Sequence, residues 1–426
     1  MRNVCPRCRE PTINSTAATP QARDSGHARG PTGPTSFWPT ATSTDAIIDF
    51  GVPGVLRVVA RGDSEEDRAA VGRDIGRSDI GRADTGGADT GGTGPAGDRF
   101  PDVAIRFVDQ LSPSGLRVLD GGCAGYGDGG VYFLDPSTHA PLARVSLGAR
   151  WGEARIVCRR GLRRVPFLST ALDLSALFHH WAPVHASGWV SPAGTGVLVA
   201  GWAHSGKTGA LLSACERGAS PVGDDRILLS PSGARMVGLG RPLDVKDWHM
   251  AQLRLGALGR RPVRRTLAEV ASAVDAGFRR VSDGTSPGPV SRLASRALHR
   301  LRRGLSLEVP AEQFSPVAQG ARIDVVILLE THRYASIVAE RVTPASGARR
   351  LAAQTEGELL PALREHLAFR YAQADGGWAD VGRAPARARS ILAEATLGLP
   401  TYLVRHPYPC PLQELDAVIT GVVEEL

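Results

Sequence analysis

Apolar and polar positions alternate in short runs between about residues 99 and 165. This period-2 pattern is typical of strands with one face in the core, and turn-forming residues separate the runs. The runs cover residues 103–108, 130–134, 143–147 and 154–158. We therefore predict an antiparallel, β-rich segment, which ends in a helix over residues 168–181.

The second half of the chain carries longer apolar stretches. Residues 197–200 and 323–330 have the length and composition of buried strands. Between them, residues 207–217 place apolar side chains on one helical face, and Gly218 is a natural helix stop. The later elements predicted from the pattern are two helices at about 344–372 and 383–396, a short strand at 401–404 and a closing helix from residue 412.

The first 97 residues lack an extended pattern of either kind. They are rich in Pro, Thr, Ser and Gly, with a short apolar patch at 47–60 and a degenerate Asp/Gly repeat at 74–93. Such a sequence buries too little apolar area to offset its chain entropy, so we predict a disordered low-complexity region over 1–97. The remaining chain divides into the β-rich lead-in at 98–183 and a core domain at 184–426.

The composition is that of a globular but basic protein, with 426 residues, 42% of them hydrophobic, and a formal net charge of +7. This charge is compatible with acidic ligands such as nucleotides and by itself does not indicate a nucleic-acid-binding protein. Many arginines gather in a basic helical insertion at 255–304. We interpret it as a solvated face, with docking of an acidic or nucleic-acid partner as the alternative.

Cysteine usage and the N-terminus predict a cytoplasmic protein. The six cysteines lack the spacing of a disulfide framework, and the N-terminus has no apolar core of a signal peptide. Residues 174–206 contain no Asp, Glu, Lys or Arg, but Pro183, Pro192 and three histidines before the loop exclude a membrane span. Cys5 and Cys8 have no second pair at ligand spacing and do not indicate a zinc site.

One segment carries a specific chemical signature, the phosphate-loop pattern G-x-x-x-x-G-K-[ST]. Its residues are Gly201, Trp202, Ala203, His204, Ser205, Gly206, Lys207 and Thr208. The chain has 48 arginines but only two lysines, and Lys207 is one of them. A compact ammonium fits among backbone amides where a planar guanidinium does not. The apolar run before the loop and the helix after it predict that backbone N–H groups and Lys207 bind nucleotide phosphates, with Thr208 on Mg²⁺.

Two adjacent carboxylates, Asp224 and Asp225, follow the loop closely. A helix of about eleven residues is roughly 16 Å long, and we predict that it returns the chain to the strand beside the loop. Both carboxylates can then reach the γ-phosphate and its Mg²⁺, one as a metal ligand and the other as the acceptor of a hydroxyl proton. The alternative is an ordinary turn before the apolar residues 227–229.

Together these features resemble the catalytic domain of the HPr kinase/phosphorylase family and its kinase relatives. The resemblance rests on the order and spacing of His185, Ser187, the apolar strand, Lys207, Thr208, Gly218, Asp224 and Asp225. It is specific over about 185–230, weaker from about 98 to the C-terminus, and absent from 1–97. It implies an α/β fold with a mixed β-sheet P-loop kinase core, like that of phosphoenolpyruvate carboxykinase. It also implies ATP and Mg²⁺ as cofactors and a serine hydroxyl on a protein or peptide as the acceptor.

The resemblance further implies roles for single residues. Lys207 and Thr208 take the phosphate and metal roles, Asp224 matches the family's catalytic base, and Asp225 matches a metal-side or supporting carboxylate. His185 matches a histidine near the transferred phosphate. HPr kinases are oligomers, so a homo-oligomer is compatible with the resemblance, although the chain has no readable self-association motif.

The sequence departs from the family pattern in the loop, in a missing segment and in the basic insertion at 255–304. Trp202, Ala203 and His204 stand where relatives carry small residues and another glycine, and His204 is expected to point into the nucleotide site. No counterpart of the segment linked to phosphorolysis is present, so phosphorylase activity is not predicted. We interpret Lys246 as a surface lysine, with contact to phosphate or acceptor as the alternative. The alternative functions are an ATP-binding regulatory protein without transfer activity and a small-molecule kinase.

Overall fold

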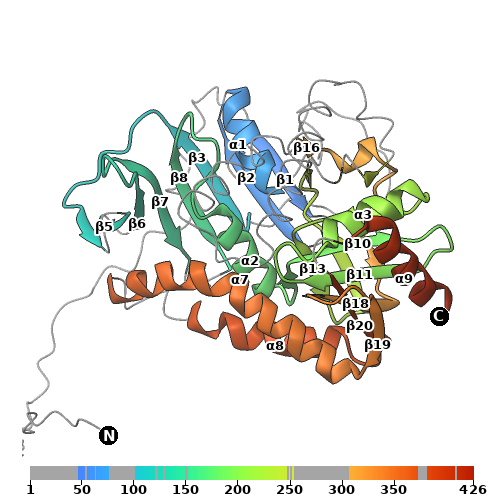
Figure 1. The fold of residues 1–426 in the computed structure, drawn as a ribbon. Helices are drawn as coiled ribbons and strands as arrows, with labels where there is room; N and C mark the ends of the chain where they lie inside the picture. The colour runs from blue at the N-terminus through green and yellow to red at the C-terminus, as the bar shows by residue number, and fades with distance from the viewer. Residues whose placement is uncertain are drawn as a thin grey trace, which may run out of the picture. The chain divides into compact units, whose positions relative to one another are not determined.

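The described residues form a mixed α/β unit. In this computed structural model they are 47–52, 55–62, 64–75, 101–119, 123–127, 130–148, 152–246, 249, 252–253, 307–372, 381–407 and 410–426. All of them belong to one compact unit, Asp45–Leu426. Within these residues the strands form sheets of eight, six, four and two strands (Figure 1). The predicted insertion at 255–304 and the Cys5/Cys8 pair lie outside the described residues.

The largest sheet orders its strands β1-β2-β3-β8-β7-β6-β5-β4. The strands are β1 (Ile47–Val52), β2 (Leu56–Arg61), β3 (Val103–Val108), β4 (Arg117–Leu119), β5 (Ala124–Gly127), β6 (Gly130–Leu134), β7 (Pro141–Leu147) and β8 (Ala154–Arg159). β3 runs parallel to both of its neighbours, while the other pairs are antiparallel. The four predicted runs are therefore strands, but the prediction of a purely antiparallel segment is wrong at β3.

Part of the region predicted to be disordered is folded. β1, β2 and helix α1 (Glu65–Ile75) lie inside residues 1–97, and α1 lies between the parallel strands β2 and β3 in the chain. Val58 and Val71 have no solvent exposure. The disorder prediction is wrong for these elements because a partner strand far along the chain covers an apolar patch that is too short to fold alone. Residues 1–46 and 76–97 lie outside the described residues.

A six-stranded mixed sheet carries the phosphate-loop segment, with the order β12-β10-β11-β18-β20-β19. Its strands are β10 (Ala186–Val190), β11 (Gly196–Gly201), β12 (Ser220–Gly223), β18 (Val325–His332), β19 (Val338–Val342) and β20 (Thr401–Pro407). β11, β18 and β20 are parallel, and the outer strands pair antiparallel. The strand that precedes Asp224, β12, pairs with β10 rather than with β11. The prediction that it lies directly beside the loop strand is therefore wrong by one position.

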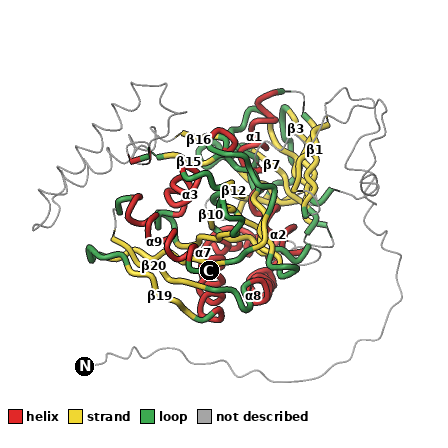
Figure 2. Tube along the Cα trace, turned by 90° about the vertical axis from the view of Figure 1, so that its right-hand side faces the viewer, coloured by secondary structure: helices red, strands yellow, loops and turns green. Residues whose placement is uncertain are grey.

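Helices cover both faces of this sheet (Figures 1 and 2). α3 (Lys207–Glu216) and α9 (Leu412–Glu424) lie against one face and α7 (Pro344–Ala372) lies against the other. α8 (Ala384–Ala395) packs on α7, and α2 (Leu168–Phe178) contacts both α8 and the eight-stranded sheet. The side chains of β11 alternate between two cores. Leu198 and Ala200 pack in the cluster that includes α7 and α8, whereas Val197 and Val199 pack in the cluster of α3 and α9. Burial of both faces explains why β11 is a continuous apolar run.

Two small antiparallel sheets complete the described fold. One orders its strands β17 (Ala321–Arg322), β14 (Arg235–Gly238), β13 (Ile227–Ser230) and β9 (Ala182–Val184); the other pairs β15 (Leu243–Val245) with β16 (Leu307–Val309), which precedes a 3₁₀ turn at Ala311–Gln313. The predicted helices at 344–372 and 383–396, the strand at 401–404 and the closing helix agree with α7, α8, β20 and α9. β19 was not predicted, because four of its five residues are exposed and no buried face marks it.

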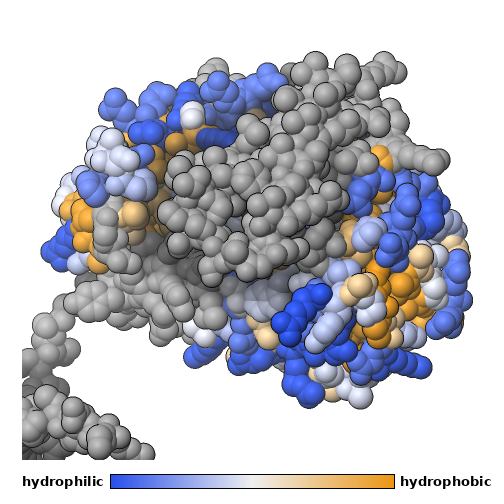
Figure 3. Space-filling model, in the orientation of Figure 1, coloured by the Kyte–Doolittle hydropathy of each residue, from blue (hydrophilic) through white to orange (hydrophobic). Residues whose placement is uncertain are grey.

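α8 illustrates how these helices meet solvent. Ala388, Ile391 and Leu392 are buried against the core, while Arg389 and Glu394 are exposed. The lower part of the face in Figure 3, where α8 lies, is accordingly mostly hydrophilic. Among the described residues, no helix combines the length and the apolar character needed to cross a membrane.

Candidate functional site

The phosphate-loop segment joins the buried strand β11 to helix α3. β11 ends at Gly201 and α3 begins at Lys207, so the loop lies at the carboxyl edge of the parallel strands. Gly206 caps the helix in a left-handed conformation (φ 93°), and no side chain caps the helix. The N–H groups of a first helical turn have no acceptor within the helix. The N-terminus of α3 is therefore open to an anionic ligand.

At the start of the loop, position 201 has no room for a side chain and therefore requires glycine. A Cβ at this position would lie 2.5 Å from the Ser205 Oγ and 2.6 Å from the carbonyl oxygen of Leu329. We expect Gly201→Ala to lower the free energy of unfolding by about 2 kcal/mol, as overpacking of a buried site does, and to weaken nucleotide binding. Gly421→Ala in α9, where no atom lies within 4 Å of the added Cβ, is the matched control. Urea unfolding curves that coincide for the two variants would contradict this account of the loop.

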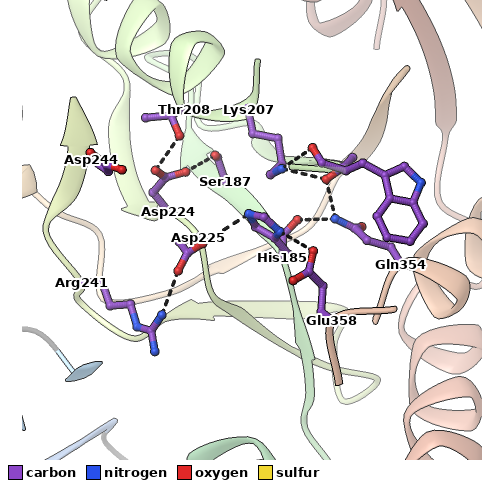
Figure 4. Close-up of polar contacts among 12 residues, drawn as sticks. His185, Ser187, Lys207, Thr208, Asp224, Asp225, Arg241, Asp244, Gln354 and Glu358 are labelled. Carbon is purple, nitrogen blue, oxygen red and sulfur yellow. Dashed lines mark hydrogen bonds and ion pairs between the residues drawn. The ribbon is translucent and has the colours of Figure 1, made fainter. Parts of the chain in front are cut away.

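Lys207 is buried beneath the loop, with 5% of its surface exposed. Its Nζ donates hydrogen bonds to the carbonyl oxygens of Gly201 (2.7 Å) and Trp202 (2.9 Å), as the dashed lines in Figure 4 mark. Burial lowers the pKa of Lys207 to about 8, although three nearby carboxylates oppose the shift. Because the loop holds the ammonium in place, the site is pre-organised for a phosphate group.

Side chains from distant elements fix the loop from behind. Gln354 of α7 donates from Nε2 to the carbonyl oxygens of Gly201 (2.5 Å) and His185 (2.8 Å). The His406 Nε2 of β20 lies 2.9 Å from the carbonyl oxygen of Ser205. Both side chains are buried. The loop is therefore held by the sheet and by α7, and not by its own sequence alone.

If the loop binds a nucleotide, its affinity for that nucleotide is expected to fall as the pH rises through about 8. Lysine ordinarily keeps its charge to near pH 10.5, but the lowered pKa of Lys207 means that its charge is present below about 8 and lost above it. If phosphate binding needs the ammonium, the Kd of a fluorescent ATP analogue should rise about tenfold per pH unit above that value. Lys207→Met should bind weakly at every pH. A wild-type affinity that stays constant over the same range would contradict the prediction.

Asp224 is the buried carboxylate of the site. Its Oδ1 accepts a hydrogen bond from the Ser187 hydroxyl, and its Oδ2 accepts one from the Thr208 hydroxyl at 2.8 Å. Burial raises the pKa of Asp224, while these two hydrogen bonds and Lys207 oppose the shift. The contact with Thr208 places Asp224 where a metal ligand of a phosphate loop is expected.

Asp225 lies on the solvent side of Asp224, in a left-handed backbone conformation (φ 65°). Its Oδ1 lies 3.3 Å from the His185 Nε2, and its Oδ2 accepts a hydrogen bond from Arg241 at 2.8 Å. The other ring nitrogen of His185 lies 2.9 Å from the Glu358 carboxylate. Desolvation alone would raise the pKa of Asp225. The interactions with Arg241, His185 and Arg226 outweigh desolvation, so the pKa is lowered overall. Since 54% of its side chain is exposed, the carboxylate remains accessible.

These side chains face one pocket of about 300 Å³. The predicted site residues that line it are His185, Ala203, His204, Gly206, Lys207, Thr208, Asp224 and Asp225. Gly201, Trp202 and Ser205 are not in the lining: Ser205 is buried, and Trp202 is 58% exposed to solvent. Lys246 also lines the pocket, paired with Asp244, so the geometry favours contact with phosphate or acceptor over the interpretation as an isolated surface lysine.

The residues present fit a nucleotide with Mg²⁺. The Ser205 Oγ is buried inside the loop and has no hydrogen-bond partner among the described residues. Mg²⁺ in nucleotide sites uses one or two protein oxygens together with phosphates and water. Thr208 and Asp224 supply such oxygens side by side. In the described part of the chain, no group of three or more His, Cys, Asp or Glu side chains offers an all-protein metal site.

Several residues of the site were missed from the sequence. Arg241, Gln354 and Glu358 contact the predicted residues directly, and Arg73 and Arg164 line the pocket. None of them belongs to a local motif. A signal existed only for Arg241, which lies near Lys246 in the chain; the others come from elements that tertiary packing brings to the loop.

No protein-family model and no curated protein matches this sequence.

Proposed function

We propose that this protein is an ATP-dependent kinase that transfers the γ-phosphoryl group to a serine hydroxyl of a protein or peptide. The observation that carries the proposal is the convergence of Lys207, Thr208 and Asp224 at the uncapped N-terminus of α3. A glycine turn before an ordinary helix does not require a buried lysine beside a buried carboxylate. Burial of both charges is unfavourable in the absence of a ligand, which supports selection for a function.

The nucleotide side of the site follows from the loop. Backbone N–H groups at the start of α3 face the phosphates, and Lys207 neutralises charge on the β- and γ-phosphates. Thr208 and Asp224 would hold Mg²⁺, which supplies charge neutralisation and alignment of the phosphates when bound.

The acceptor side is formed by Asp225 and His185. In the transfer, the serine oxygen forms a bond to the γ-phosphorus, the bond to the bridging oxygen breaks, and ADP leaves. The hydroxyl proton goes to a carboxylate. Both oxygens of Asp224 already accept hydrogen bonds deep in the site, whereas Asp225 is half exposed and faces the pocket.

This geometry supports an exchange of the roles predicted from the sequence. Asp224 takes the metal side, and Asp225 accepts the proton, with His185 and Arg241 orienting its carboxylate. The raised pKa of Asp224 would by itself favour Asp224 as the base. A divalent cation beside Thr208 reverses that preference, because its charge stabilises the ionised form of the nearest carboxylate.

The test is transfer of label from γ-radiolabelled ATP in an extract of the source cells, with and without Mg²⁺. A labelled protein or peptide that yields phosphoserine on acid hydrolysis is the expected result. ATP binding without any labelled product would favour the regulatory protein, and label confined to a small molecule would favour the small-molecule kinase. Absence of ATP binding would overturn the interpretation of the loop itself.

A further inference from the structure

The far wall of the pocket is basic and comes from outside the phosphate-loop core. Arg73 lies in the last turn of α1, Arg164 lies between β8 and α2, and Arg241 precedes β15. All three line the pocket with Lys207 and Asp225. We call Arg73, Arg164 and Arg241 the basic wall. Two of its members, Arg73 and Arg164, belong to the segment around the eight-stranded sheet.

Packing holds the basic wall together. The Arg241 Nε donates to the carbonyl oxygen of Asp74 at 2.8 Å, and the Arg73 Nη1 donates to the carbonyl oxygen of Arg163 at 2.6 Å. The Asp74 carboxylate lies 3.6 Å from Arg164 and 3.7 Å from Arg241. These contacts tie the end of α1 to the edge of the pocket. The wall is therefore a built surface and not a chance gathering of long side chains.

The three arginines of the basic wall carry more positive charge than the carboxylates paired with them neutralise. Asp74 is buried and shared by Arg164 and Arg241, while Asp225 binds Arg241 and His185. Within the described residues, no carboxylate forms an ion pair with Arg73. Glu308 lines the pocket too, but its ion-pair partner among the described residues is Arg163, at 3.9 Å and outside the lining. An anion between Arg73 and Arg164 would complete the charge balance.

The position of the wall points to the acceptor and not to the nucleotide. Figure 4 shows Arg241 on the side of Asp225 that faces away from Lys207 and Thr208. A group that binds the wall at Arg241 lies beyond Asp225 as seen from the phosphate loop. Arginine forks are suited to carboxylates and phosphates, which they bind through two parallel hydrogen bonds.

We propose that the basic wall binds an anionic group, a carboxylate or a phosphate, that the acceptor carries next to its reactive hydroxyl. This inference rests on the proposed kinase function, and it narrows the acceptor to acidic peptides or phosphorylated molecules. The anion fixes the acceptor on Arg73 and Arg164, and Arg241 couples this contact to the orientation of Asp225.

The test is a pair of blocked tetrapeptides that differ only in having Asp or Asn before the serine. Each is titrated calorimetrically into the protein loaded with Mg²⁺ and a non-hydrolysable ATP analogue. We expect the Asp peptide to bind at least about tenfold more tightly than its Asn twin. Arg73→Ala/Arg164→Ala should remove this difference, and Arg163→Ala, a neighbouring arginine outside the pocket, should keep it. The Kd of the ATP analogue should change less than about twofold in every variant.

Two outcomes overturn the proposal. One is equal binding of the two peptides by the wild type or an unchanged preference in the double variant. The other is a double variant that loses affinity for the ATP analogue instead, which would assign the wall to the nucleotide. Inorganic phosphate is also titrated in competition with the Asp peptide. Displacement of the peptide indicates a phosphate site, and absence of displacement indicates a carboxylate site. Melting curves verify that the double variant is folded, as expected because the Arg164 side chain is 57% exposed.

Failure of the kinase proposal is recognised separately. If the ATP analogue does not bind the wild type, the proposed kinase function is wrong. The peptides and inorganic phosphate are then titrated into the nucleotide-free protein, which tests the anion site separately. A preference for the Asp peptide that depends on Arg73 and Arg164 would then keep the anion site. Its absence would overturn the anion site as well.

Discussion

Lys207→Ala is expected to weaken ATP binding by a factor of about 100 or more and to abolish transfer to any acceptor. Lys207 is the buried cation of the loop, and its Nζ donates hydrogen bonds to the carbonyl oxygens of Gly201 and Trp202. Its removal leaves the phosphates facing two carboxylates without a compensating charge. Arginine should not rescue the variant, because a planar guanidinium does not fit in the space of an ammonium. Equilibrium binding of a fluorescent ATP analogue measures the loss.

The other lysine of the chain provides a matched control. Lys246 lines the same pocket, but its ammonium is paired with Asp244 and its side chain is 32% exposed. We expect Lys246→Ala to change ATP affinity by less than about tenfold, in keeping with a partly screened pair. Equal losses in the two variants would mean that the pocket attracts nucleotide only by its overall charge. An unchanged affinity in folded Lys207→Ala would contradict the phosphate-loop interpretation.

Asp224→Asn is expected to lower transfer by a factor of about 100 or more without lowering thermal stability. The buried carboxylate has a raised pKa because burial disfavours its charged form. A neutral amide of the same shape removes that unfavourable burial and still accepts a hydrogen bond from Thr208 or Ser187. Activity and stability should therefore respond in opposite directions, as a functional residue predicts and a structural one does not. Label transfer and melting curves of the same preparation test the two effects.

Asp225→Asn distinguishes the roles of the two carboxylates. Asp225 has a lowered pKa and binds Arg241 and His185, so its neutralisation should reduce stability as well as transfer. If Asp224 holds the metal, Asp224→Asn should need a higher Mg²⁺ concentration for half-maximal ATP binding, whereas Asp225→Asn should not. The reverse result would restore the roles predicted from the sequence.

Much of the core could be predicted because its signals are local. The apolar run 197–200, the glycines of the loop and the helix that follows are each specified by a few adjacent residues, and β11 and α3 agree with them. The C-terminal helices α7, α8 and α9 were predicted for the same reason. Adjacent carboxylates at a short distance from the loop placed Asp224 and Asp225 in the site.

The N-terminal region could not be predicted in this way. β1 and β2 form only a short apolar patch, α1 is mostly polar, and the composition of the surrounding residues predicts disorder. They fold because β2 pairs with β3 across a long stretch of chain and because α1 packs on the same sheet. This long-range pairing also brings Arg73 to the pocket.

The sequence by itself determined the loop, its lysine and the two carboxylates, because strand, glycine turn and helix start are set by neighbouring residues. Only the tertiary structure decided which carboxylate lies beside Thr208, which residues orient His185 and Asp225, and that a basic wall closes the pocket. Those relations depend on the pairing of β10 with β12 and on contacts from α1 and α7. Burial and charge act between side chains that meet in space, and sequence separation does not record which side chains meet.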